Sequence, residues 1–113
     1  MYLADGNMEL CTLEDTAAAG LMPVERLVPV DTFAYRERSL GYNRVYKAMG
    51  AGSQADRVVR TWPNENAVPG HYCVDGDGTQ WRIEVVQRLT DTDGLPCLDI
   101  TLARLDSLYD VAD

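Results

Sequence analysis

Two short runs carry the residue types that could do metal chemistry. Asp75-Gly76-Asp77-Gly78 and Asp91-Thr92-Asp93-Gly94 invite a calcium interpretation, since hard cations take several carboxylate oxygens from a tight loop. The register argues against it, because a calcium loop that begins at Asp75 would need glycine at Gln80 and glutamate at Val86. Glycine supplies the positive φ of tight turns, so both runs predict β-hairpin turns and we expect no metal site.

A histidine and a cysteine form the second chemical candidate. His71 and Cys73 lie two positions apart, so on a strand they share a face, as a thiolate and imidazole pair would require. No glycine-rich nucleophile turn accompanies them, and no Gly-x-Gly-x-x-Gly or Walker-type motif occurs in the sequence. Cys11, Cys73 and Cys97 are an odd number without a Cys-x-x-Cys pair, which favours buried free thiols. We therefore expect no enzyme and no cofactor.

Composition bounds the class of protein. With 113 residues, of which 46% are hydrophobic and 25% charged, residues 1–113 are predicted to form a single globular domain. Eighteen acidic against ten basic residues give a net charge of −8, which disfavours wrapping of nucleic acid but allows a wall that surrounds DNA without binding it. No apolar run approaches the ~18 residues of a membrane span, and no signal-peptide pattern is present. We expect synthesis in the cytoplasm and no membrane contact.

The elements that must position these residues are mostly strands. Alternation and β-branched content predict strands over residues 8–13, 24–35, 56–62 and 71–74 and a long antiparallel hairpin over residues 79–103. Pro29 places the second strand at an edge or a bulge. In the hairpin one face is predicted to carry Trp81, Ile83 and Val85 and, on the return strand, Leu98, Ile100 and Leu102. The opposite, outward face is predicted to carry Arg82, Glu84, Asp99 and Thr101.

One helix is predicted after the second strand. Ser39 can cap it, and apolar residues at i, i+3, i+4 and i+7 give it one face; they are Tyr42, Val45, Tyr46 and Met49. Gly50 and Gly52 end it. The predicted class is mainly β, or α+β by count: a small barrel or sandwich of about six strands with one short helix. Residues 106–113 form an acidic tail, predicted to be a short helix or an arm that docks on a neighbour.

Basic residues gather in sequence around the predicted helix. They are Arg36, Arg38, Arg44, Arg57 and Arg60. One interpretation is a solvated face. The other is a set of contacts between subunits, in which these arginines meet the acidic C-terminal region of a neighbour, including Tyr109 and Asp110, because segregated opposite charges suit head-to-tail assembly.

The order of these motifs resembles a family. A strand leads to Tyr35-Arg36-Glu37-Arg38-Ser39, a short helix ends in residues 45–52 (Val-Tyr-Lys-Ala-Met-Gly-Ala-Gly), and Val58-Val59-Arg60 follows. Asp75-Gly76 then precedes Trp81-Arg82-Ile83-Glu84-Val85. Over roughly residues 8–104 this order resembles the head closure (head-tail connector, or stopper) proteins of long-tailed phages and prophages. Arg44 and Val45 depart from it, because the family commonly carries an acidic residue and an aromatic there.

The resemblance implies a fold and a role. It implies a small antiparallel β-barrel with one helix that assembles as a ring, expected to be a dodecamer, in the virion neck between the portal-bound adaptor and the tail terminator or other tail proteins. The ring would surround the packaged genome and retain it without reading its sequence or using a cofactor. A glycine-flanked gate is expected in residues 41–53, at Gly41, Gly50, Gly52 and Ser53, or in the loop over residues 63–70.

Two other functions stay open. The chain could be a different neck or tail-completion protein. It could also be a small acidic binding or inhibitory module that imitates nucleic acid and binds a basic protein with strong salt dependence. Whether the free protein is a monomer also stays open.

Overall fold

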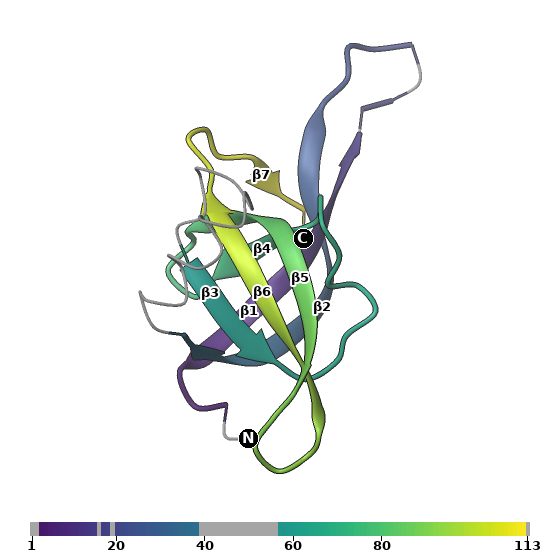
Figure 1. Ribbon diagram of the computed structural model, residues 1–113. Coiled ribbons are helices and arrows are strands. Elements are labelled where there is room, and N and C mark those ends of the chain that lie inside the picture. The colour runs from purple at the N-terminus through teal and green to yellow at the C-terminus, as the bar shows by residue number, and fades with distance from the viewer. Residues whose placement is uncertain (1–2, 16, 19, 39–56, 113) are drawn as a thin grey trace.

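The computed structural model describes residues 3–15, 17–18, 20–38 and 57–112, and all regular elements in these ranges are β-strands (Figure 1). The strands are β1 (Gly6–Asp15), β2 (Glu25–Glu37), β3 (Arg57–Thr61), β4 (Tyr72–Asp75), β5 (Gln80–Thr90), β6 (Pro96–Arg104) and β7 (Asp110–Val111). The prediction of a mainly β protein is confirmed. The predicted helix lies outside the described residues, as do Arg44 and the four gate residues Gly41, Gly50, Gly52 and Ser53.

Six of the strands form a closed ring of pairings. The order is β1-β4-β5-β6-β3-β2, and β1 pairs again with β2. All pairings in the ring are antiparallel, whereas β7 adds to β2 in parallel. A closed ring leaves few open strand edges, which is one way in which β proteins avoid uncontrolled edge-to-edge association.

The interior of the ring holds the core, because alternate residues of each strand point inward. Its buried members are Met8, Leu10, Phe33, Tyr35, Val59, Ala67, Cys73, Ile83, Leu98, Ile100 and Leu102. The inward orientation predicted for Leu98, Ile100 and Leu102 is therefore confirmed. Gly6 begins β1 at φ +150°, and a Cβ there would lie 3.0 Å from the Tyr35 hydroxyl, so this position needs glycine.

A bulge in β5 corrects one prediction. The register with β6 shifts between Ile83, which lies opposite Leu102, and Val85, which lies opposite Thr101. The extra residue reverses the alternation, so Val86 packs against the core in place of the predicted Val85. Arg82 and Glu84 share a face as predicted and form an ion pair with an N–O distance of 2.5 Å.

The outward face of β6 is a second correction. Asp99 and Thr101 were expected to face solvent, but both side chains have no exposed area. Asp99 is buried because it pairs with Arg60 of the neighbouring β3. From Cys97 to Ala103 both faces of β6 are therefore buried.

The remaining turns and strand ends follow the sequence. In β2 the register against β1 shifts so that Leu10 lies opposite Asp31 and Cys11 opposite Pro29, which confirms the bulge predicted at Pro29. Both Asp-Gly runs form hairpin turns: Gly78 donates its N–H to the Asp75 carbonyl, and Gly94 donates to the Asp91 carbonyl.

In the described part of the chain no helix is long and apolar enough to cross a membrane.

In its described residues the C-terminal tail forms no helix, and its end docks on its own chain rather than extending as an arm toward a neighbour. Asp110 and Val111 form β7, which pairs in parallel with Arg26 and Leu27 of β2 in the same chain. The Gln80 side chain fixes the strand just before it, because its amide donates to the Tyr109 carbonyl (2.7 Å) and accepts from the Tyr109 N–H (2.9 Å).

Candidate functional site

A hairpin arm projects from the ring. Residues 8–11 of β1 pair with both β2 and β4, but from Thr12 to Asp15 the partner of β1 is β2, in a register that runs from Thr12 opposite Val28 to Asp15 opposite Glu25. The two strands therefore leave the ring together, and the molecule is elongated at 51 × 26 × 23 Å (Figure 1). We call the segment from Thr12 to Val28 the arm.

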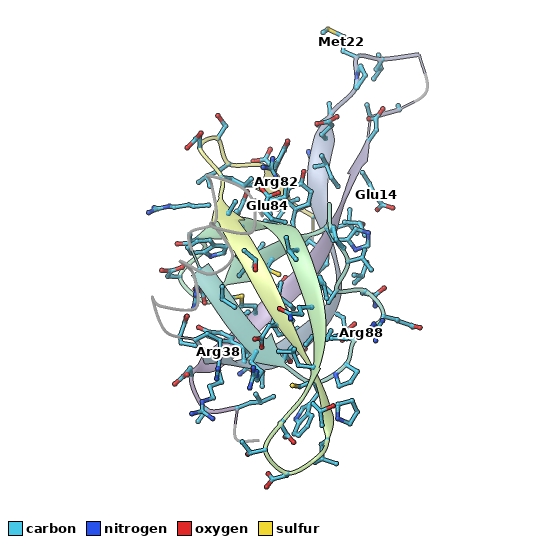
Figure 2. All side chains as sticks on the ribbon, viewed as in Figure 1. Glu14, Met22, Arg38, Arg82, Glu84 and Arg88 are labelled. Atoms are coloured by element: carbon cyan, nitrogen blue, oxygen red, sulfur yellow. The ribbon has the colours of Figure 1, made fainter. Side chains whose placement is uncertain are left out.

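The end of the arm is apolar and exposed. Leu21, Met22 and Val24 are 69%, 85% and 42% exposed, and with Pro23 they form what we call the arm tip. Figure 2 shows Met22 at the far end of the molecule. Scattered exposed apolar residues are common, but three within four positions at the end of a paired hairpin make the arm tip a candidate interaction site.

Asp15 holds the base of the arm tip together. Its Oδ1 accepts the backbone N–H groups of Ala17 and Val24, each at 3.0 Å. These hydrogen bonds stabilise the carboxylate and lower the pKa of Asp15 below its ordinary value of 3.8. The tip is therefore organised at neutral pH.

This hydrogen bonding gives a pH prediction. Because the folded pKa is lowered, the stabilisation is present above the ordinary aspartate pKa and is lost as the pH falls through the folded value. The amide proton shifts of Ala17 and Val24 should titrate together, with a midpoint below 3.8. The Asp15→Ala variant should abolish that titration, whereas Glu14→Ala, an exposed neighbour, should leave it intact. Independent titration of the two amides would contradict the shared carboxylate.

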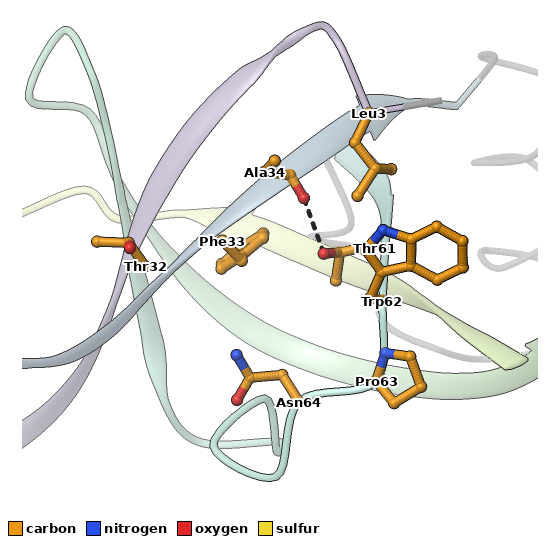
Figure 3. A pocket seen from close by; sticks show the side chains of 8 residues that line it. All are labelled: Leu3, Thr32, Phe33, Ala34, Thr61, Trp62, Pro63 and Asn64. Atoms are coloured by element: carbon orange, nitrogen blue, oxygen red, sulfur yellow. Dashed lines mark hydrogen bonds between the residues drawn. The ribbon is translucent and has the colours of Figure 1, made fainter. Parts of the chain in front are cut away.

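A groove opens in the ring where β2 and β3 separate. These strands pair only at Arg36–Arg60 and Glu37–Val59, and beyond that point the Thr61 hydroxyl donates to the Ala34 carbonyl at 2.8 Å. The resulting groove of about 380 Å³, which we call the side groove, is drawn in Figure 3 and is lined by Leu3, Thr32, Phe33, Ala34, Thr61, Trp62, Pro63 and Asn64. Most of the lining side chains are apolar, and Trp62 is 38% exposed, so the groove is accessible from solvent.

Side chains cap the β2 backbone along the side groove. The Asp31 Oδ1 accepts the N–H of Thr32 at 2.8 Å, and its Oδ2 accepts the Asn64 amide. Pro29 has no backbone N–H that could donate a hydrogen bond, and the Ala34 carbonyl already accepts one from the Thr61 hydroxyl. The groove is therefore suited to side chains rather than to an added strand.

Arg57 is engaged within the chain. Its guanidinium donates to Asp75 at 2.7 Å and to the Tyr35 hydroxyl at 2.9 Å, and it forms an ion pair with Glu37. It also lies over the rings of Tyr35 and Trp81, at 5.0 and 5.1 Å from their centroids. Burial opposes its charge, but the hydrogen bonds outweigh burial and raise the pKa of Arg57.

Of the other residues predicted for subunit contacts, Arg60 and Tyr109 also serve the fold of their own chain. Arg60 forms a two-pronged pair with buried Asp99, at 2.6 and 3.0 Å. The Tyr109 ring packs edge-on against Tyr72, with centroids 5.9 Å apart. Arg36 and Asp110 are exposed, whereas Arg38 is half-buried. A role in subunit contacts stays a prediction for the set, and among its described arginines Arg36 is the most accessible.

The histidine and cysteine pair is not arranged for nucleophilic catalysis. Cys73 is fully buried, and desolvation raises the pKa of its thiol far above the ordinary value. The His71 Nδ1 lies 2.8 Å from the Asn66 carbonyl. Burial also raises the pKa of Cys11, to about 11, and that of Cys97. The prediction of buried free thiols is confirmed.

The carboxylates of the Asp-Gly runs hold their own turns. Asp77 accepts the Thr79 N–H, and Asp91 accepts the N–H groups of Asp93 and Leu95, which lowers the pKa of both aspartates. Within the described residues no group of three or more potential ligands is placed to hold a metal ion. The oxygens thus stabilise hairpins.

The loop over residues 63–70, one of the two candidate gates, is tied down at several points. The backbone N–H of Gly70 donates to the Ile83 carbonyl at 2.9 Å, and that of Ala67 donates to the Asn64 carbonyl. The Ala67 side chain belongs to the core. A moving gate in this loop would have to break these contacts, and the gate stays a prediction for both segments.

The sequence analysis missed the arm tip and the side groove. The signal for the tip was present in the sequence. Leu21-Met22-Pro23-Val24 is an apolar run between an alanine-rich stretch and a strand, and it lacks the alternation that would place its side chains on one buried face. The groove gave no such signal, because Leu3, Phe33 and Trp62 come together only through the pairing of distant strands.

Comparison with known proteins returns no relative. No family model matches the chain, and neither the curated proteins nor the solved structures include a match.

Proposed function

We propose that this chain is a structural protein of a phage neck, a head-closure ring component that joins the portal and its adaptor to the tail and retains the packaged DNA. In this proposal the six-stranded ring of pairings is a small antiparallel β-barrel and acts as the rigid body of one subunit. The observation that carries the proposal is the arm with its exposed apolar tip. Exposing apolar side chains to water is unfavourable in a free protein, whereas such a tip can bind a neighbouring subunit in an assembly.

The use of polar groups supports an assembly role over catalysis. Arg57 and Arg60 are engaged in internal pairs, the thiols are buried, and the turn aspartates accept backbone N–H groups of their own turns. The net charge of −8 suits a channel through which DNA slides, because adhesion to DNA scales with the number of phosphates that cations neutralise.

The proposal predicts the result of deleting the gene from its prophage. After induction, negative-stain electron microscopy should show separate full-length tails beside tailless heads, many of them empty of DNA. Tails of abnormal length would instead indicate a tail-completion protein, the nearest alternative. Complementation with the intact gene should restore joined particles, and it controls for effects on neighbouring genes.

Intact virions in the deletion lysate would reject the neck role. The alternative would then be the acidic binding module, for which the charge of −8 is the supporting observation. Such a module should retain a basic protein at low salt and release it as ionic strength rises, because exposed charges are screened within about 8 Å at physiological salt.

A further inference from the structure

The arm tip and the side groove match each other in chemistry. The tip offers Leu21, Met22 and Val24 to solvent, and the groove offers an apolar lining around Trp62 with a volume of about 380 Å³. This volume falls within the ~300–1,000 Å³ typical of pockets that bury a ligand. Within the described residues the tip stays exposed to solvent and the groove stays open.

The two surfaces lie toward opposite ends of the molecule. Met22 is at the far end of the arm, whereas β3 runs away from the arm and ends near the N-terminus, where the groove begins (Figures 1 and 2). The arm projects away from the ring that holds the groove, so in this structure the tip of a chain does not reach its own groove (Figures 1 and 2). A contact between different surfaces of identical chains repeats head to tail and closes into a ring when the rotation allows.

Charge favours the same pairing. Below the tip the arm carries three acidic residues, Glu14, Asp15 and Glu25, and one basic residue, Arg26, so its charge is acidic on balance. Arg88 borders the groove, since it shares the adjoining hollow with Pro63 and Asn64, which also line the groove. Arg36 is exposed on β2, two residues beyond the groove residue Ala34. The carboxylates described near this rim are Asp31, which is bound to Asn64 and Thr32, Glu65, and Glu37, which pairs with Arg57.

We propose that the arm tip of one copy of this chain inserts into the side groove of a second copy, in a head-to-tail contact that repeats around a ring. Met22 and Leu21 fill the groove against Trp62 and Phe33, and the acidic base of the arm meets Arg88 and Arg36. The inference rests on the proposed ring-forming neck function, and it names the partner and the surface through which the ring forms.

Cross-linking between two single-cysteine variants tests the contact. The three native cysteines are 0–1% exposed, so an engineered surface thiol is the reactive one among the described residues. Met22→Cys marks the tip, Pro63→Cys marks the groove, and Thr92→Cys in the exposed β5–β6 turn marks neither. A short bismaleimide is added to 1:1 mixtures of the purified variants, and covalent dimers are quantified on denaturing gels.

The tip and groove variants should link at least about tenfold more than the tip variant with the Thr92→Cys control, because a formed contact raises the local thiol concentration toward millimolar. Adding Leu21→Asp to the tip variant, or Trp62→Ala to the groove variant, should reduce the yield to the control level. Both second-site changes affect exposed side chains, and circular dichroism checks that the fold is kept.

Equal yields in all mixtures would overturn the proposal. Preferential linking of Met22→Cys to itself would also overturn it, because that result places two tips together. The deletion lysate is independent of these results. Tailless heads without a tip-to-groove link would reject this contact and keep the neck role, whereas a strong link beside intact virions would keep the contact and reject the neck role.

Discussion

Replacing Arg60 with methionine is expected to lower the free energy of unfolding by about 3–5 kcal/mol, the usual cost of removing one partner from a buried ion pair. Asp99 has no exposed area, and among the described residues its carboxylate accepts hydrogen bonds from Arg60, at 2.6 and 3.0 Å. Methionine keeps most of the side-chain length, so the loss of stability reports the cost of leaving the Asp99 carboxylate buried without a partner rather than the cost of a cavity. A domain of this size has about 5–15 kcal/mol of stability in total, so the effect is large.

Urea denaturation of the variants measures this effect. Asp99→Asn should cost less than Arg60→Met, about 1–3 kcal/mol, because the Arg60 side chain is 15% exposed and can still reach water. The double variant Arg60→Met/Asp99→Leu should recover most of the loss, since well-packed apolar pairs often equal buried ion pairs. The control is Arg36→Met, which changes the exposed arginine directly opposite Arg60 and should stay within about 0.5 kcal/mol. A loss below 1 kcal/mol for Arg60→Met would contradict the interpretation.

The sequence predicted the strands well because their signal is local. Alternation and turn residues located β5, β6 and both Asp-Gly hairpins, and Pro29 located the bulge in β2. These features depend on the backbone preferences of a few neighbouring residues, which are visible without knowing the fold.

The errors have a different origin. The bulge in β5 exchanges Val85 for Val86 in the core, and a period-2 pattern has no means of registering one extra residue. Alternation with Leu98 and Ile100 predicts that Asp99 lies on the opposite face of the strand, and that face was taken to be exposed to solvent. The partner of Asp99, Arg60, lies 39 residues away in sequence, so only the pairing of β3 with β6 brings the two together.

The same limit applies to the candidate site. The arginines around residues 36–60 were treated as one group because they are close in sequence. In the structure Arg57 pairs with Asp75 and Arg60 pairs with Asp99, on opposite faces of β3. Alternation along β3 separates them, since residues an odd number apart face opposite sides of a strand. The tail was similarly predicted to be a short helix or an arm that docks on a neighbour, because its pairing with Arg26 and Leu27 involves backbone groups that carry no sequence signal.

The second large effect is expected at Arg57. Arg57→Met should lower the free energy of unfolding by about 2–4 kcal/mol, because charged hydrogen bonds contribute roughly 1.5–3 kcal/mol and stacking on aromatic rings adds to this. The expected loss is smaller than for Arg60, since Glu37 is 42% exposed and Asp75 is 20% exposed, so both carboxylates can be solvated when Arg57 is removed. Arg57→Lys keeps the charge but loses the planar fork, and it should cost about 1–2 kcal/mol.

Tryptophan fluorescence separates this effect from a general loss of stability. Trp81 lies 5.1 Å from the Arg57 guanidinium, whereas the other tryptophan, Trp62, is in the side groove. In a Trp62→Phe background the emission reports Trp81 alone, and Arg57→Met should change its intensity and wavelength in the folded state, before any denaturant is added. Arg88→Met removes an exposed arginine elsewhere and should change neither emission nor stability. If Arg57→Met lowered stability while the emission of Trp81 stayed the same, the loss would come from the carboxylates alone and the stacking would contribute nothing.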